Sequence, residues 1–129
     1  MLRVLSAAAL LAAPAAAQDR LTPGEFLDRA EGRTLTFSQA QTGTLVGVEQ
    51  FLRRDLSVWA TADGRCTYGR IEVREDLVCF IYEDNPDPDN CWTPFDMEGK
   101  IVVLSVTGDI QEVTNVSRTP VACRDAPVS

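Results

Sequence analysis

Acidic side chains are concentrated in residues 83–90, Glu-Asp-Asn-Pro-Asp-Pro-Asp-Asn. Closely spaced carboxylates can bind Ca²⁺, which takes about six to eight oxygen ligands, and Asp84, Asp87 and Asp89 are the candidate ligands. The spacing is not that of an EF-hand, because Trp92 stands where the loop glycine is expected. Proline, Asn and Asp also form ordinary turns. We therefore expect a solvated hairpin loop, with calcium as the weaker alternative and no other cofactor.

Catalytic chemistry has few candidates in this chain. It contains no histidine, which excludes Ser-His-Asp and Cys-His catalysis and imidazole metal sites. Glu72, Glu83 and Asp84 are the possible members of a carboxylate pair for glycoside hydrolysis, but no pattern places them in a cleft. The sequence therefore favours a protein that is not an enzyme.

An aromatic surface patch is the main candidate for binding. Trp59, Tyr68 and Arg70 are expected on one sheet face, where they would contact a sugar, a lipid or a protein partner. The alternative is that the N-terminal helix covers them.

The four cysteines indicate two disulfides, as is common in small exported domains. The favoured pairing joins Cys79 to Cys91 across one hairpin loop and Cys66 to Cys123 near the C-terminus. The hairpin register also brings Cys66 near the acidic loop, so a Cys66–Cys91 pairing remains a competitor. No C-x-x-C pair is present to indicate a redox or zinc site.

Residues 1–17 have the pattern of a signal peptide. Arg3 precedes the apolar run 4–11, and Ala15-Ala16-Ala17 is a small-residue cleavage site. The apolar run is shorter than the roughly 20 residues of a membrane-spanning helix. Cleavage near Ala17 would leave one β-rich domain, residues 18–129, in the periplasm or outside the cell. The net charge of −7 argues against nucleic acid and anionic membrane as partners.

The elements that position these residues are mainly strands. Residues 67–74 and 77–83 form a predicted hairpin around Glu75-Asp76, which pairs Val73 with Val78, Ile71 with Phe80 and Gly69 with Tyr82. Tyr82 is then expected to lie over Gly69. A second two-residue turn at Asp63-Gly64 would place Trp59 opposite Tyr68, and Leu56, Val58 and Ala60 on the face of Ile71.

A single short helix precedes the strands, over residues 21–30. Thr22 is its expected N-cap, Glu25 completes a capping box, and Phe26, Leu27 and Ala30 would face the sheet. Strands are predicted at 34–38, 44–52, 56–60, 67–74, 77–83, 91–96, 101–107 and 111–118. The fold class is mainly β: an antiparallel meander of about eight strands, barrel-like or a sandwich. In a barrel, Phe80, Tyr82, Ile71 and Val58 would line a filled interior.

The middle of the chain resembles a family of small exported alphaproteobacterial proteins of unknown function. The shared pattern appears here as Asp63-Gly64, Gly69-Arg70-Ile71, Val78-Cys79-Phe80 and Cys91-Trp92, with Ile71 at a position where that family often has tryptophan. The resemblance implies a periplasmic or secreted β-rich domain in which the two later cysteines occur together, which supports the Cys79–Cys91 pairing. It implies no catalytic residues.

These observations lead to three functional hypotheses. The leading one is an exported, non-enzymatic binding or interaction module of the cell envelope, with an unknown protein or small ligand as its partner. The second is a small lipocalin-like carrier of an apolar ligand, which requires a cavity. The third is a small hydrolase using paired carboxylates, which requires two of them to meet in a pocket.

Overall fold

The structure is a computed structural model that describes residues 4–9 and 19–124. The expected cleavage site near Ala17 lies outside these residues. The described residues form nine strands and one helix. In chain order these are β1 (Asp19–Arg20), α1 (Pro23–Ala30), β2 (Thr34–Gln39), β3 (Leu45–Arg53), β4 (Leu56–Thr61), β5 (Cys66–Arg74), β6 (Leu77–Tyr82), β7 (Cys91–Met97), β8 (Lys100–Ser105) and β9 (Ile110–Ser117).

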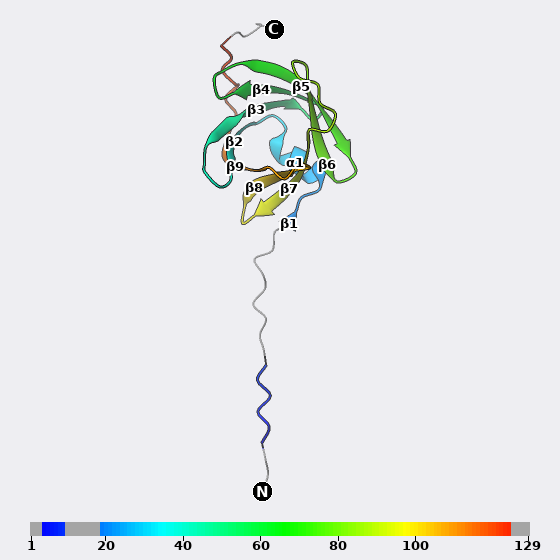
Figure 1. Ribbon diagram of the computed structural model, residues 1–129, viewed down its shortest axis with the longest axis vertical. Coiled ribbons are helices and arrows are strands. Elements are labelled where there is room, and N and C mark those ends of the chain that lie inside the picture. The colour runs from blue at the N-terminus through cyan, green and yellow to red at the C-terminus, as the bar shows by residue number, and fades with distance from the viewer. Residues whose placement is uncertain (1–3, 10–18, 125–129) are drawn as a thin grey trace.

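Eight of the strands close into an antiparallel barrel (Figure 1). Each strand from β2 to β8 pairs with the next strand along the chain, and β2 pairs with β9 to complete the ring. The predicted antiparallel meander with one short helix is confirmed, and it takes the form of a barrel rather than a sandwich. Closure pairs the two strands that would otherwise be edges of the sheet.

The shortest seam of the barrel lies between β6 and β7. These strands align through Val78–Trp92 and Cys79–Cys91, and the second of these pairs is also a disulfide. Farther along the same strand, β7 pairs with the additional strand β1. The other disulfide joins Cys66 to Cys123. Both favoured pairings are therefore confirmed, and the competing Cys66–Cys91 pairing does not form.

The hairpin between β5 and β6 has the predicted register. Gly69 pairs with Tyr82, Ile71 with Phe80 and Val73 with Val78. Glu75 in the two-residue connection has φ of 56°, the left-handed conformation that such tight hairpin turns require. Local turn geometry and strand pattern agree at this hairpin, which explains why its register could be read from the sequence.

The hairpin between β4 and β5 differs from the prediction by one residue. The N–H of Thr61 donates to the carbonyl of Arg65 at 2.9 Å, and Gly64 has φ of 88°, so the loop has three residues instead of two. Trp59 consequently pairs with Thr67, and Val58 pairs with Tyr68. A shift of one residue turns every side chain of a strand to the other face.

This shift corrects two predictions. Ser57 is directly opposite Gly69, on the inner face that carries Ile71, so Ser57 and Trp59 face the barrel interior. Val58 shares the outer face with Tyr68 and therefore does not line the interior. The predicted surface patch required Trp59, Tyr68 and Arg70 to share one face of the sheet, but Trp59 faces inward and the other two face outward.

Helix α1 begins as predicted. The hydroxyl of Thr22 accepts a hydrogen bond from the Glu25 N–H at 3.1 Å, while the Glu25 carboxylate accepts one from the Thr22 N–H at 3.0 Å. Phe26, Leu27 and Ala30 are buried. Figure 1 shows the helix across the opening of the ring of strands. Its Glu25 and Asp28 are exposed, so one face of the helix packs on the barrel core and the other faces solvent, and an ion pair of 2.8 Å joins Arg29 to Asp96 of β7.

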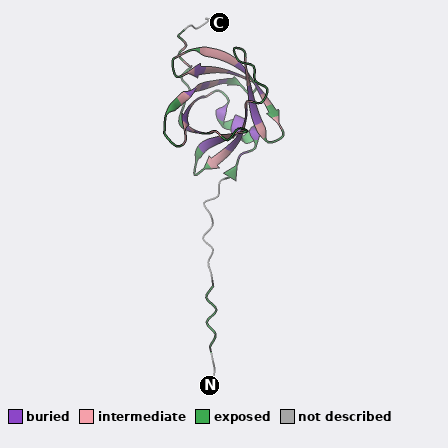
Figure 2. Cartoon of the chain, in the orientation of Figure 1, coloured by how far each residue is buried: buried purple, intermediate pink, exposed green. Residues whose placement is uncertain are grey.

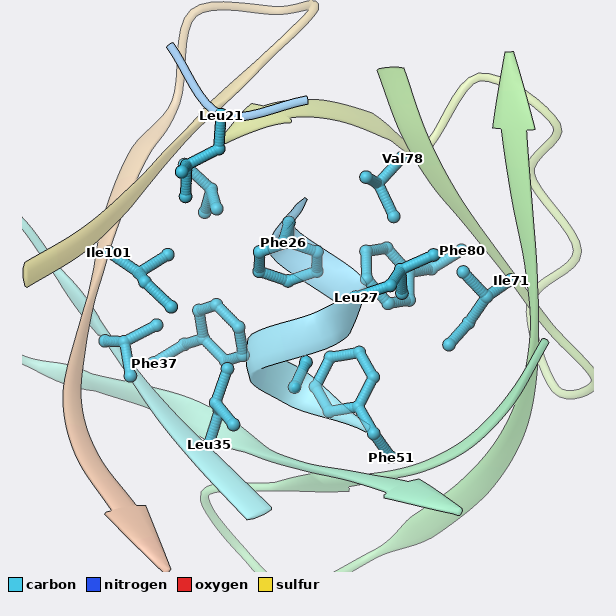
Figure 3. Close-up of a cluster of buried hydrophobic side chains, with 13 residues drawn as sticks. Leu21, Phe26, Leu27, Leu35, Phe37, Phe51, Ile71, Val78, Phe80 and Ile101 are labelled. Carbon is cyan, nitrogen blue, oxygen red and sulfur yellow. The ribbon is translucent and has the colours of Figure 1, made fainter. Parts of the chain in front are cut away.

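The hydrophobic core lies between α1 and the inner faces of the strands. Figure 2 shows buried residues on the helix and along the strands that surround it. Figure 3 shows Phe26 and Leu27 among side chains that the strands contribute. Phe51 lies edge-on to Phe26 and Phe80, with ring centroids 5.8 and 6.1 Å apart. The helix thus fills part of the barrel with aromatic and aliphatic side chains.

Candidate functional site

A cavity of about 330 Å³, partly open to solvent, lies between inner-face side chains of the barrel and the loop at residues 83–90. The expectation of a filled interior is confirmed for the core cluster that includes Ile71 and Phe80, whereas Tyr82 and Phe80 also border this open cavity, and Phe26 belongs both to the core and to the cavity wall. Ligand pockets in proteins start at about this volume. The cavity is lined by Phe26, Phe37, Glu49, Trp59, Val78, Phe80, Tyr82, Asn85, Asp87, Asn90, Trp92, Pro94, Val103 and Gln111.

Glu49 is the charged group placed deepest in this wall. It lies in the middle of β3, with Leu35 and Trp59 as its cross-strand neighbours, and is 1% exposed. Its Oε1 accepts two hydrogen bonds, from the Ser57 hydroxyl at 2.8 Å and from the Tyr82 hydroxyl at 2.9 Å. Its Oε2 is buried and has no hydrogen-bond partner among the described residues. One carboxyl oxygen is therefore held by the barrel, and the other is unsatisfied.

Burial raises the pKa of Glu49 to about 8, because the hydrogen bonds from Ser57 and Tyr82 offset only part of the cost of removing a charge from water. Burial and the adjacent Glu49 raise the pKa of the Tyr82 hydroxyl well above its ordinary value of 10.0. At neutral pH Glu49 is therefore mainly protonated. Since Oε1 accepts two hydrogen bonds, the proton of the neutral form is on Oε2.

Two glycines allow aromatic rings to lie against the barrel wall. A Cβ atom on Gly69 would be 2.7 Å from the Tyr82 ring, and one on Gly47 would be 2.4 Å from the Trp59 ring. The predicted placement of Tyr82 over Gly69 is confirmed. The Trp59 ring centroid lies 6.2 Å from that of Tyr82 and 6.3 Å from that of Phe37, so the rings form a continuous aromatic wall.

The acidic loop contributes to the same cavity. Asn85, Asp87 and Asn90 line it. The Asn90 side chain donates to the Phe80 carbonyl at 3.0 Å and accepts from the Trp92 indole N–H at 2.9 Å, which holds the end of the loop against the barrel. The disulfide at Cys91 fixes the same end covalently to β6.

The calcium hypothesis gains no support from this loop. Across residues 4–9 and 19–124, no group of three or more His, Cys, Asp or Glu side chains is arranged to hold a metal ion. Asp84, Asp87 and Asp89 are therefore not brought together as ligands. Asp87 instead accepts a hydrogen bond from the Asp89 N–H at 2.9 Å, an ordinary turn contact.

The other predicted site residues are separated by the barrel wall. Trp59 lines the cavity, whereas Arg70 is exposed outside it and bonds to Glu72 at 3.0 Å. Glu72 also accepts a hydrogen bond from Arg74 at 2.8 Å. The bonds from Arg74 and Arg70 lower the pKa of Glu72, which is the opposite of what a catalytic acid needs.

Sequence reasoning missed Glu49, which is the central polar residue of the site. The signal was present in β3, because Gly47, Glu49 and Phe51 alternate onto one face of the strand. A carboxylate that shares the inward face of a strand with a glycine and a phenylalanine is expected to be buried. Trp92, Asn90 and Gln111 were also missed, since they line the same cavity as Glu49 only because the barrel closes.

Among the described residues, the helix α1 is not long and apolar enough to span a bilayer. The two disulfides fit a protein of an extracellular or periplasmic compartment. In the comparisons with known proteins, no family model, no curated protein and no solved structure matches this chain.

Proposed function

We propose that this protein is an exported binding protein that carries a small, mainly apolar molecule inside its barrel. The observation that carries the proposal is the unsatisfied Oε2 of Glu49, a residue that lines a cavity with several aromatic and aliphatic side chains. A buried polar atom without a partner costs about 1–3 kcal/mol, and a ligand group that pairs with it removes that cost. Apolar cavities with a few polar groups that orient the ligand are typical of small-molecule sites.

The cavity favours a carrier over the two other hypotheses. An interaction module would use the outer surface, where the expected Trp59, Tyr68 and Arg70 patch does not assemble. The carboxylates that the sequence offered for a hydrolase, Glu72, Glu83 and Asp84, are not among the residues that line the cavity, and Glu72 is held by two arginines. The acidic loop and the Cys79–Cys91 disulfide then have a role in shaping the cavity wall.

Intrinsic fluorescence gives a direct test, because the chain has two tryptophans and both of them line the cavity. A panel of small apolar compounds should change the emission of the purified, oxidised protein in a saturable way. Trp59→Phe and Trp92→Phe should each leave part of the signal.

A matched pair of substitutions locates the binding. Val103→Phe places a larger side chain in the cavity lining, which reduces the space for a ligand and should weaken binding. Val73→Phe, at a position that is 53% exposed and outside the lining, should not. Emission that no compound changes, or binding that Val103→Phe leaves intact, would contradict the proposal.

A further inference from the structure

We propose that the ligand is an organic cation, a protonated amine on a compact apolar body, whose ammonium group pairs with Oε2 of Glu49. This inference rests on the proposed carrier function and names the chemical class of its ligand. It depends on the position of Glu49, on the charge of the cavity lining and on the aromatic wall.

The geometry of Glu49 suits an ammonium group. Ser57 and Tyr82 orient the carboxyl by bonding to Oε1, which leaves Oε2 without a donor among the described residues. Because Oε2 is buried, an ammonium in the cavity reaches it only when the side chains around it shift. An ionised carboxylate in an apolar interior needs a paired cation. An ammonium at Oε2 would complete both the hydrogen bonding and the charge balance of this residue.

The titratable side chains that line the cavity are acidic, although Arg74 contacts the Pro88 carbonyl of the adjoining loop. Two carboxyl groups, of Glu49 and Asp87, are among the side chains that line the cavity, and none of the lining side chains belongs to Lys or Arg. The loop from Glu83 to Asn90, which supplies three of the lining residues, carries four acidic residues in all. Charge of one sign around a cavity raises the local concentration of ligands of the opposite sign.

The aromatic wall suits a cation as well as an apolar body. Trp59, Tyr82 and Phe80 present consecutive rings, with the centroids of Tyr82 and Phe80 6.3 Å apart and their planes at 13°. Cations are attracted to the faces of such rings, most strongly to tryptophan. A neutral ligand would use the apolar surface but neither the ring electrostatics nor the acidic lining.

Binding of the ammonium form requires a proton to leave. In the free protein Glu49 carries a proton on Oε2; when the protonated amine binds, that proton passes to solvent and the carboxylate pairs with the ammonium. The other titratable groups that line the cavity are Tyr82 and Asp87, and Asp84 acts on Tyr82 from the loop. Tyr82 stays neutral throughout, because its pKa is raised, so the released proton comes from Glu49.

The test compares isosteric amines and alcohols. The purified, oxidised protein is titrated with 1-aminoadamantane and 1-adamantanol, and then with benzylamine and benzyl alcohol, by calorimetry in buffers of different ionisation enthalpy. We expect each amine to bind at least about tenfold more tightly than its alcohol above pH 8, with amine affinity falling about tenfold per pH unit below it. Near pH 6.5, amine binding should release about one proton and alcohol binding none.

Glu49→Gln provides the matched variant, because a Gln side chain keeps an oxygen for the bonds from Ser57 and Tyr82. It should lose the preference for amines and the proton release, whatever affinity it keeps for the alcohols. If the alcohols bind as tightly as the amines and no proton is released, the ligand is a neutral molecule: the amine inference fails and the carrier function stands. If neither the amines nor the alcohols bind the wild-type protein, both proposals fail. Proton release by the wild-type protein is decisive even where the variant does not fold.

Discussion

The hydroxyl of Tyr82 in β6 donates a 2.9 Å hydrogen bond to the carboxyl of Glu49 in β3, although two other strands separate them in the barrel wall. The side chain reaches this far because it lies across Gly69 of β5 and beside Ser57 of β4, where no larger side chain intervenes. One contact therefore couples four consecutive strands. The predictions below examine this contact and the seam that encloses it.

Gly69→Ala should displace the Tyr82 ring, because the added Cβ would lie 2.7 Å from it and 2.9 Å from the Ser57 hydroxyl. Overpacking of this kind costs about 1–3 kcal/mol of unfolding free energy. Denaturant unfolding measures the loss. The control is Gly24→Ala in the first turn of α1, where the nearest atoms lie 3.9 Å from the added Cβ and the stability should stay level or rise. Equal stability of the two variants would contradict the close packing of Tyr82 on Gly69.

Glu49 should make the folded state less stable as the pH rises. Its pKa is about 8 in the folded protein and near 4.5 when unfolded, so between these values the folded state holds a proton that the unfolded state has released. The stabilisation is complete below about pH 4.5 and is lost as the pH rises through about 8. Glu49→Gln removes this contribution. Thermal unfolding between about pH 4 and 9 should show the variant gaining on the wild type as the pH rises. Parallel curves would show that Glu49 does not titrate as its burial requires.

Tyr82→Phe should raise the pKa of Glu49 above about 8, because the hydrogen bond from the Tyr82 hydroxyl lowers it. The loss of that bond should also cost about 1 kcal/mol of unfolding free energy. The pH range over which the stabilisation by protonated Glu49 is lost should therefore extend upward, and the same thermal scans measure this shift. Tyr68→Phe, on the outer face opposite Val58, is the matched control and should change neither quantity. A shift in the Tyr68 variant would mean that the two faces are assigned wrongly.

The two disulfides should have separable roles. Cys66–Cys123 spans 57 residues and Cys79–Cys91 spans 12, so removal of the first as a Ser pair should cost more stability, within the usual range of about 2–4 kcal/mol for each. Removal of Cys79–Cys91 should instead loosen the short β6–β7 seam and the adjoining loop that lines the cavity. Tryptophan emission at low denaturant, read at Trp92 beside Cys91, should shift in the second variant and stay unchanged in the first. If the emission shifted only in the first variant, the Cys66–Cys123 disulfide would be the one that holds the cavity wall in place.

Much of the local structure could be predicted from neighbouring residues alone. Thr22 and Glu25 lie three residues apart, so their reciprocal capping bonds depend on one helical turn. The β5–β6 hairpin is likewise decided by a two-residue connection and by the apolar alternation on either side of it. Such features need no information about distant parts of the chain, and they came out as expected.

The candidate site depends on contacts that no short stretch contains. At Asp63-Gly64 the sequence is compatible with a two- or a three-residue loop, and the barrel favours the one that turns Trp59 inward. Glu49 becomes a buried acid only when β2, β4 and β6 surround it with Leu35, Trp59 and Tyr82. Burial and closure sum contributions from residues far apart in the chain, so local propensity predicted the strands, whereas their assembly produced the cavity and the unsatisfied carboxyl oxygen within it.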